Sequence, residues 1–307
     1  MIGSGAAALA LALVPLGPQE IPSFAAEVDN VYVDAFVTHK GQPVTGLTAE
    51  NFEIRDNRVR QQVRLVSLDA VPVAVLLVFD TSASVAGETL RHLRAAGHAV
   101  LDGLRPGERA ALVTFNQDVV VRVPPDGDLT RVREALDRVH ARGATALYDA
   151  TFAGLALPTR GARSVIVLFS DGEDNSSWLE AEEVLAVTAR ADVLLQAVGT
   201  TQTVAEVHRG LRGEMPTGPE IRHVRSSRVD DLRRIAESTG GRFWPAERTA
   251  HLKDTFTRIL AEMRTRYLLT YQPTGVVRTG EHELEVRLKN AKGKVRSRSR
   301  YFVAPSP

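Results

Sequence analysis

The stretch VAVLLVFDTSASVAG, residues 73 to 87, decides the fold that we predict. Its first seven residues are all apolar, which is typical of a strand buried on both faces of a parallel sheet. The run stops at an aspartate, and two serines follow at every second position, giving Asp80, Ser82 and Ser84. Side chains of this kind either cap a following helix or hold a ligand, and the stretch alone leaves both interpretations open.

The bulk composition is that of an ordinary globular protein. At 307 residues the chain is long enough for two domains, and its charges nearly balance at a formal net charge of +1. This balance gives no support to bulk binding of nucleic acid or of anionic lipid, so we predict no nucleic-acid partner. Cysteine is absent, which excludes a disulfide framework, a thiolate metal site and a thiol nucleophile.

The N-terminus resembles an export signal. Residues 6 to 14, AAALALALV, form a short apolar run, and SFAAE at 23–27 offers small residues suited to signal-peptidase cleavage. The run is shorter than the roughly 20 residues that span a bilayer. We interpret 1–26 as a signal peptide, although no Lys or Arg precedes the run; the alternative is an Ala-rich end or a misassigned start. Since no later segment is long and apolar enough to cross a membrane, we predict a periplasmic, cell-surface or secreted protein.

Beyond residue 70, apolar strands alternate with amphipathic helices. This alternation predicts an α/β domain over 71–265, a doubly wound and mostly parallel sheet with helices on both faces. In such sheets ligands bind at the carboxyl ends of the strands. The strands after the first are expected at 111–116, 164–172, 191–199 and 241–244, and the helices at 88–104, 128–140, from 145 onward, 178–190, 230–241 and 249–263.

The segments on either side of this domain have the pattern of β-strands. Residues 27–70 alternate apolar and polar side chains, with turn signals at 40–43 and at Asp56-Asn57. The segment is too small for an independent sandwich. Residues 266–307 contain three more strands, so we predict that the two segments pack together as one small β-sandwich-like domain, interrupted by the α/β unit.

Three loops of the predicted sheet carry oxygen-bearing side chains at its carboxyl edge. The first carries Asp80, Ser82 and Ser84, the second has Thr145 just after Gly143 and Ala144, and the third has Asp171 at the Ser-Asp-Gly end of the apolar stretch 164–172. Two carboxylates and three hydroxyls are hard donors, suited to Mg²⁺ or Mn²⁺ and not to zinc. The alternating spacing lets one turning loop direct three side chains at a common centre.

The motifs FDTSAS, GAT and FSDGED resemble the metal-ion-dependent adhesion site of von Willebrand factor type A domains, and the resemblance covers residues 71 to about 265. The flanking segments GQPVTGLTAENFEI and RSRYFV resemble a bacterial subgroup of exported proteins. The resemblance implies that Ser82, Ser84 and Thr145 ligate the ion through their hydroxyls. It implies that Asp80 and Asp171 act mostly through bound waters, with Mg²⁺ as the ion, or else Mn²⁺ or Ca²⁺.

A shell of neutral hydroxyls leaves a dication under-neutralised, so it attracts one more anionic ligand. We therefore predict a non-enzymatic adhesion or scaffolding module, whose protein partner supplies an Asp or Glu carboxylate and which has no catalytic residues. One alternative is a Mg²⁺-dependent phosphatase-like hydrolase, although Ser82 stands where such enzymes carry a second acid. Another is a structural scaffold with a vestigial metal site. No P-loop, dinucleotide fingerprint or nucleophile elbow is present.

Several local features have simpler interpretations. For Asp80, Ser82 and Ser84 the alternative is a set of caps for the helix at 88–104, and the matching positions of Thr145 and Asp171 favour the ligand interpretation over it. The acids at 173–174 are explained as first-turn acids at a helix N-terminus, and Ser177 with Glu180 as a capping box. We interpret Trp178 and Trp244 as packing residues. The basic side chains of the last strand are interpreted as a solvated face that discourages edge aggregation; they are Lys294, Arg296, Arg298 and Arg300.

Overall fold

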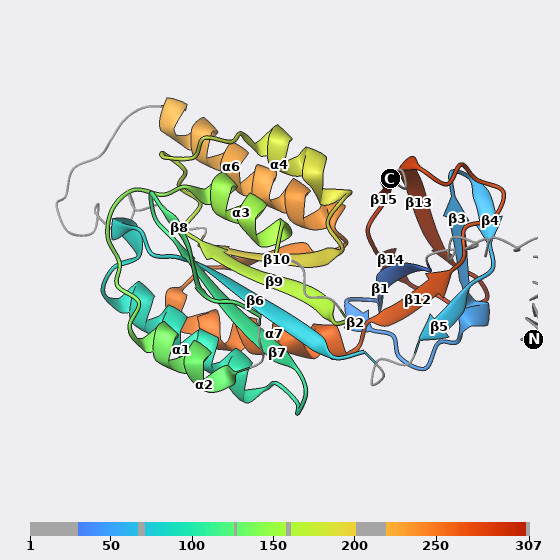
Figure 1. The fold of residues 1–307 in the computed structure, drawn as a ribbon, viewed down its shortest axis with the longest axis horizontal. Helices are drawn as coiled ribbons and strands as arrows, with labels where there is room; N and C mark the ends of the chain where they lie inside the picture. The colour runs from blue at the N-terminus through green and yellow to red at the C-terminus, as the bar shows by residue number, and fades with distance from the viewer. Residues whose placement is uncertain (1–29, 67–70, 126–127, 158–160, 201–218, 305–307) are drawn as a thin grey trace, which may run out of the picture.

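The computed structural model describes residues 30–66, 71–125, 128–157, 161–200 and 219–304, and only the backbone between 219 and 228. The predicted signal peptide, 1–26, lies outside these residues. The chain forms an α/β unit and a smaller β domain that lie next to each other (Figure 1). Both chain ends of the α/β unit lead into the β domain, whose strands come from the two ends of the sequence.

A six-stranded sheet, ordered β11-β10-β9-β6-β7-β8, forms the centre of the α/β unit. All its pairings are parallel except that of the edge strand β8, an antiparallel strand that the sequence pattern did not predict. The strands are β6 (Val73–Asp80), β7 (Arg109–Phe115), β8 (Val119–Val123), β9 (Arg163–Ser170), β10 (Val193–Thr200) and β11 (Arg242–Ala246).

Helices cover both faces of this sheet (Figure 1). Alternate residues of β6 explain why: Val75, Leu77 and Phe79 belong to one hydrophobic core, and Leu76 and Val78 to the other. The fold class predicted from the sequence is therefore confirmed. One face carries α1 (Glu88–Asp102), α2 (Leu129–Asp137) and α7 (Leu252–Arg264), and the other carries α3 (Leu147–Leu155), α4 (Ala181–Thr188) and α6 (Pro219–Ser238).

The β domain contains two sheets around a third core. One has the order β14-β1-β12-β5 with β2 paired to β1, and the other has the order β15-β13-β3-β4. Each sheet combines strands from both ends of the sequence. The strands are β1 (Val31–His39), β2 (Gln42–Pro43), β3 (Phe52–Asp56), β4 (Val59–Gln61), β5 (Arg64–Val66), β12 (Tyr267–Tyr271), β13 (Gly280–Leu288), β14 (Lys294–Arg296) and β15 (Arg300–Val303). The domain boundaries 27–70, 71–265 and 266–307 stay a prediction.

A buried ionic network joins the two parts. Arg266, between α7 and β12, is fully buried and donates to Asp34 of β1 at 3.1 Å and to the Gly240 carbonyl at 2.9 Å. Arg163, the first residue of β9, donates to both oxygens of the same carboxylate, at 2.6 Å to Oδ1, which Arg266 also contacts, and at 3.2 Å to Oδ2. Glu262 of α7 also pairs with Arg266. Because each of these charges has a partner of opposite sign, the junction can exclude water without isolating a charge.

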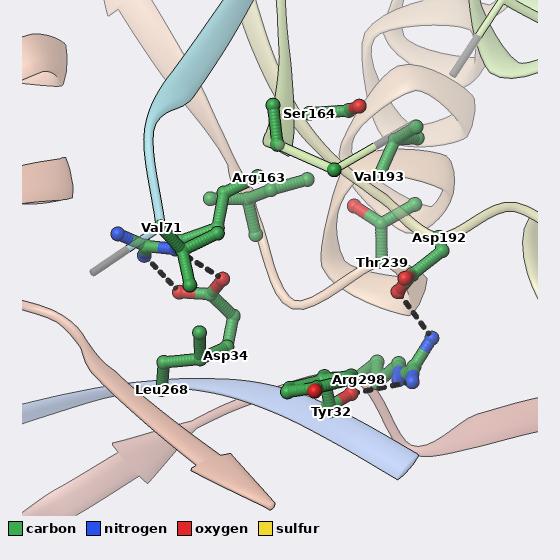
Figure 2. A pocket seen from close by; sticks show the side chains of 13 residues that line it. Tyr32, Asp34, Val71, Arg163, Ser164, Asp192, Val193, Thr239, Leu268 and Arg298 are labelled. Carbon is green, nitrogen blue, oxygen red and sulfur yellow. Dashed lines mark hydrogen bonds and ion pairs between the residues drawn. The ribbon is translucent and has the colours of Figure 1, made fainter. Parts of the chain in front are cut away.

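A cavity of about 330 Å³ lies at this junction (Figure 2). Two ion pairs cross it: Asp34 with Arg163, and Asp192 with Arg298. The hydroxyl of Thr239 accepts from the Leu195 amide and donates to the Ala236 carbonyl. These polar groups are therefore already paired with other parts of the chain, and the remaining wall includes apolar side chains such as Val193 and Leu268.

The last predicted strand is in fact two strands in different sheets, β14 and β15. Its basic side chains are not a uniformly solvated face, because Arg296 binds Glu262. Arg298 reaches Asp192 at 3.1 Å and the Tyr32 carbonyl at 2.5 Å. The earlier interpretation was wrong for these two arginines, which tie the β domain to the α/β unit. Arg300 pairs with Glu281 on the exposed surface.

Candidate metal centre

The five predicted metal ligands lie in three loops at one edge of the central sheet. Asp80 ends β6 and starts the first loop, which also carries Ser82 and Ser84. Thr145 lies just before α3, and Asp171 follows the last residue of β9. Asp80, Ser82, Thr145 and Asp171 are buried, whereas Ser84 is exposed. The donor set therefore runs from a buried floor to the surface, as access for a ligand requires.

Hydrogen bonds orient the first loop around Asp80. One carboxylate oxygen, Oδ1, accepts from the Ser82 amide at 2.9 Å, and Oδ2 accepts from the Ser170 hydroxyl at 2.8 Å. The hydroxyls of Ser82 and Ser84 lie 2.9 Å apart. The alternating spacing read in the sequence thus brings both serine oxygens together above the aspartate.

Backbone bonds hold the three loops against one another. The Ala83 amide donates to the Gly143 carbonyl at 3.0 Å, and the Arg142 amide to the Thr81 carbonyl at 2.8 Å, so the first and second loops are joined. The amides of Asn175 and Ser176 both donate to the Thr145 carbonyl at 3.0 Å, which joins the second loop to the third. The structure therefore brings together the loops that carry all five residues.

The helix-cap interpretation of the first loop is wrong. The residue that precedes α1 is Gly87, with φ at 73°, and no side chain caps that helix. Ser82 precedes a short 3₁₀ helix, Ala83–Val85, and its side chain makes no capping bond either. The hydroxyls of Ser82 and Ser84 are therefore free of the structural role that would otherwise explain them.

The electrostatics of the site are unfavourable for two ionised carboxylates. Burial and, second to it, the negative charge of Asp171 together raise the pKa of Asp80 to about 7. Oδ2 of Asp171 is buried with no hydrogen-bond partner among the described residues. Neither acid forms an ion pair with a described Lys, Arg or His. A cation would relieve both charges, so the residues present fit a metal ion.

The kinds of donor narrow the class of ion. Within the parts of the chain that the structure describes, no group of three or more His, Cys, Asp or Glu side chains could hold a metal. A site at this edge therefore depends on hydroxyl oxygens beside the two acids, a set that suits Mg²⁺ or Mn²⁺. The metal role of the five residues stays a prediction.

Ser170 was missed by the sequence reasoning. It is fully buried at the end of β9, donates to Asp80 and accepts from the Gly172 amide at 3.1 Å. One hydroxyl thus fixes the aspartate of the first loop and the start of the third. Its signal was its place in FSDG: it is the last strand residue before Asp171, next to the parallel strand that ends in Asp80.

Residues 171–179 of the acidic loop tether α3, and only its last residue, Glu180, caps α4. Asp174 accepts from the Leu147 amide at 2.8 Å, and the Asn175 side chain accepts from the Thr145 amide at 2.8 Å. The predicted capping box at Ser177 was also wrong, since α4 starts at Ala181 with Glu180 as its N-cap. The side chains of Asp174 and Asn175 thus hold the backbone around Thr145 against the third loop.

Comparisons with known proteins agree with this architecture. Residues 75–173 match the von Willebrand factor type A domain model. Among solved structures, the chain is similar to a von Willebrand factor type A protein from Catenulispora acidiphila, at 14% identity and TM-score 0.52, covering 87% of this chain and 76% of that one. No curated protein matches the chain.

The chain is also similar to proximal thread matrix protein 1 from the mussel byssus, at 17% identity and TM-score 0.50, covering 67% of this chain and 49% of that one. The same mussel protein has been solved with zinc in its adhesion-site motif, and that structure matches at 16% identity and TM-score 0.50, with the same coverage. This chain thus spans about half of the mussel protein. At such identities the likeness shows a shared fold. Domains of this type typically mediate interactions between proteins and are generally non-enzymatic.

Proposed function

We propose that this von Willebrand factor type A domain is a non-enzymatic protein-binding module that depends on Mg²⁺. The ion would be held by Asp80, Ser82, Ser84, Thr145 and Asp171. One observation carries the proposal. Asp80 and Asp171 are buried next to each other without a described cationic partner, and the pKa of Asp80 is raised to about 7. A buried charge normally has a partner, so a site built this way is arranged for a cation that comes from outside the chain.

The residues of the site would contribute two kinds of oxygen, neutral hydroxyls and charged carboxylates. Ser82, Ser84 and Thr145 offer neutral oxygens, while Ser170 keeps the Asp80 carboxylate oriented. A dication bound mainly by neutral oxygens retains positive charge and accepts one more anionic ligand. Ser84 lies at the exposed side of the site, where a partner protein can reach the ion. The additional anionic ligand would therefore be an Asp or Glu carboxylate from that partner.

The loop composition favours binding over hydrolysis. Residues 80–87, 142–146 and 171–180 contain no histidine and no lysine, so they offer no general base of the usual kind for a serine nucleophile. The position two residues after Asp80 holds Ser82, where an aspartate-nucleophile phosphatase would need a second acid. The three loops thus supply oxygen ligands without a histidine or lysine beside their serines.

We further propose that the module acts outside the cytoplasm, on the strength of the apolar run at 6–14 and the small residues at 23–27. Among the residues that the structure describes, no helix combines the length and apolar character needed to cross a membrane. The partner would then meet the metal site in the envelope or at the cell surface.

Isothermal titration with Mg²⁺ tests the proposal directly. The wild-type chain should bind the ion, and Asp80→Ala should abolish binding. Asp137→Ala removes an exposed aspartate that pairs with His98 and lies outside the three loops, so it should bind Mg²⁺ as the wild type does. Equal uptake of Mg²⁺ by the wild type and Asp80→Ala would overturn the proposal.

A further inference from the structure

Trp178 is the most exposed of the large hydrophobic side chains in the described part of the chain. It is 92% exposed, whereas Trp244 is 5% exposed and donates to Gln196 inside the α/β unit. The interpretation of both tryptophans as packing residues is therefore wrong for Trp178. Tryptophan is among the residues most enriched in the centres of protein interfaces, because a large rigid ring buries much area at little entropic cost.

The loop that presents Trp178 is fixed to α3. Its amide donates to both carboxylate oxygens of Asp149, at 3.0 and 3.2 Å, and the Leu179 amide donates to the same carboxylate at 3.0 Å. The Ser177 hydroxyl accepts from the Tyr148 amide at 3.0 Å. The ring is therefore exposed from an anchored backbone, and a partner that covers it does not need to order the loop first.

Trp178 lies close to the metal centre. The Asn175 amide donates to the Thr145 carbonyl at 3.0 Å, and Trp178 is only three residues further along. Three extended residues span at most about 11 Å. The hydrogen bonds from the backbone amide to Asp149, in the first turn of α3, hold the Trp178 backbone at the same end of that helix as Thr145. One partner segment can therefore contact the metal site and the ring together.

We propose that Trp178 is the apolar anchor of the partner interface, and that the partner is a protein segment with an Asp or Glu beside a leucine or aromatic side chain. This proposal rests on the proposed function, because the metal site supplies the carboxylate contact. At about 3.3 Å per extended residue, the two side chains of the partner should be two to four residues apart. Glu180 and Glu183, which follow Trp178 in the sequence, are exposed, and their charge disfavours an anionic lipid surface.

Selection from a library of random twelve-residue peptides, displayed on phage, tests both the role of Trp178 and the carboxylate contact of the proposed function. Selected on the full wild-type chain in Mg²⁺, the peptides should be enriched in an Asp or Glu with a Leu, Phe, Tyr or Trp two to four residues away. Selected on Trp178→Ala, they should keep the acid and lose the apolar residue. A peptide from the first pool should bind Trp178→Ala about thirtyfold more weakly, the effect of one interface hot spot.

Val277→Ala is the matched control, since it removes a 71% exposed apolar side chain of the β domain and should leave the selection unchanged. Acid enrichment without an apolar partner residue, or the same pool from wild type and Trp178→Ala, would overturn this inference while leaving the proposed function intact. A wild-type pool without acid enrichment, or one that survives EDTA, would instead overturn the proposed function.

Fluorescence provides a second readout. The chain has two tryptophans, so Trp244→Phe leaves Trp178 as the sole indole; should that variant lose stability, the difference between wild-type and Trp178→Ala spectra reports the same ring. The free protein should emit like indole in water, and a selected peptide should shift the emission to the blue in Mg²⁺ but not in EDTA. Emission typical of a buried indole before any peptide is added would overturn the proposal, because the chain itself would cover the ring.

Discussion

The acidic side chains at the two ends of strand β9, a half-buried Asp34 at one end and the buried Asp80 and Asp171 at the other, have opposite electrostatic surroundings. At its start, Arg163 pairs with Asp34, and although burial alone would raise the pKa of Asp34, the charges and hydrogen bonds of Arg163 and Arg266 lower it. Just beyond its end, Asp171 lies beside Asp80, whose pKa rises to about 7. The junction carries its own counterions, whereas the opposite edge leaves its negative charge uncompensated by the described residues.

The difference lies in the partners rather than in the degree of burial. Glu262 is as inaccessible as Asp171, yet it contacts Arg242, Arg266 and Arg296. Joining two parts of a chain requires a network that is complete in the folded protein. A ligand site requires the reverse, a charge that becomes satisfied only when something binds. Buried acids occur in both clusters. The presence or absence of cationic partners distinguishes the structural cluster at the junction from the candidate functional cluster at Asp80 and Asp171.

The largest effect should come from breaking the junction. Asp34→Asn leaves the buried Arg163 without its anion and Arg266 with Glu262 alone, so we expect it to lower the free energy of unfolding by about 3–5 kcal/mol, measured by urea denaturation. Asp102→Asn is the control: its pair with Arg133 is solvent-exposed, and the loss should stay within about 1 kcal/mol. Similar losses in the two variants would show that the junction does not depend on charge pairing.

The same substitution at the other end should act in the opposite direction. In a chelator at pH 8, Asp80→Asn removes a buried charge next to Asp171, so the free energy of unfolding should rise by about 1–3 kcal/mol. Without metal, the free energy of unfolding of the wild type should also fall as the pH rises from about 4 to about 7. In this range the folded state holds a proton on Asp80 that the unfolded state has released. Thermal unfolding in a chelator from about pH 4 to pH 8 measures both effects. A destabilised Asp80→Asn would contradict the account of an uncompensated charge.

Positioning by Ser170 should have the next largest effect. Ser170→Ala removes the hydroxyl that joins Asp80 Oδ2 to the Gly172 amide, and changes of this kind weaken metal binding about ten- to a hundredfold. Isothermal titration with Mg²⁺ measures the loss, and Ser238→Ala, whose hydroxyl bonds only within α6, is the control. Unchanged Mg²⁺ affinity in Ser170→Ala would mean that the first loop holds Asp80 without help from β9.

The features of the fold and of the site that the sequence predicts are those set by residues close together in the chain. The apolar run before Asp80 indicates a strand buried on both faces, and the end of that strand locates the first loop. The alternating Ser82 and Ser84 are a local pattern as well. The order of strands and helices then predicts that the loops of Thr145 and Asp171 meet it, because parallel strands place their carboxyl ends on one edge.

The unpredicted features depend on distant contacts. Arg266 and Asp34 are separated by 232 positions, and nothing near either residue indicates the other. The exposure of Trp178 depends on Asp149, 29 positions away, which turns the loop outward. The break between β14 and β15 arises because the β domain has two sheets and the last segment contributes to both. Such outcomes are set by tertiary packing and leave no periodic signal in the sequence.

The smallest effect that we predict is the pH dependence of metal binding. Mg²⁺ must displace the proton that Asp80 holds below a pKa of about 7, so affinity should fall about tenfold between pH 8 and pH 6 and level off above pH 8. A carboxyl with an ordinary pKa of 3.8 would be fully ionised across this range and would give a flat profile. Titrations in two buffers of different ionisation enthalpy should also show proton release at pH 6.5 and little at pH 8.5. A flat profile without proton release would mean that the metal-free site already neutralises Asp80, which would remove the contrast between the two ends of β9.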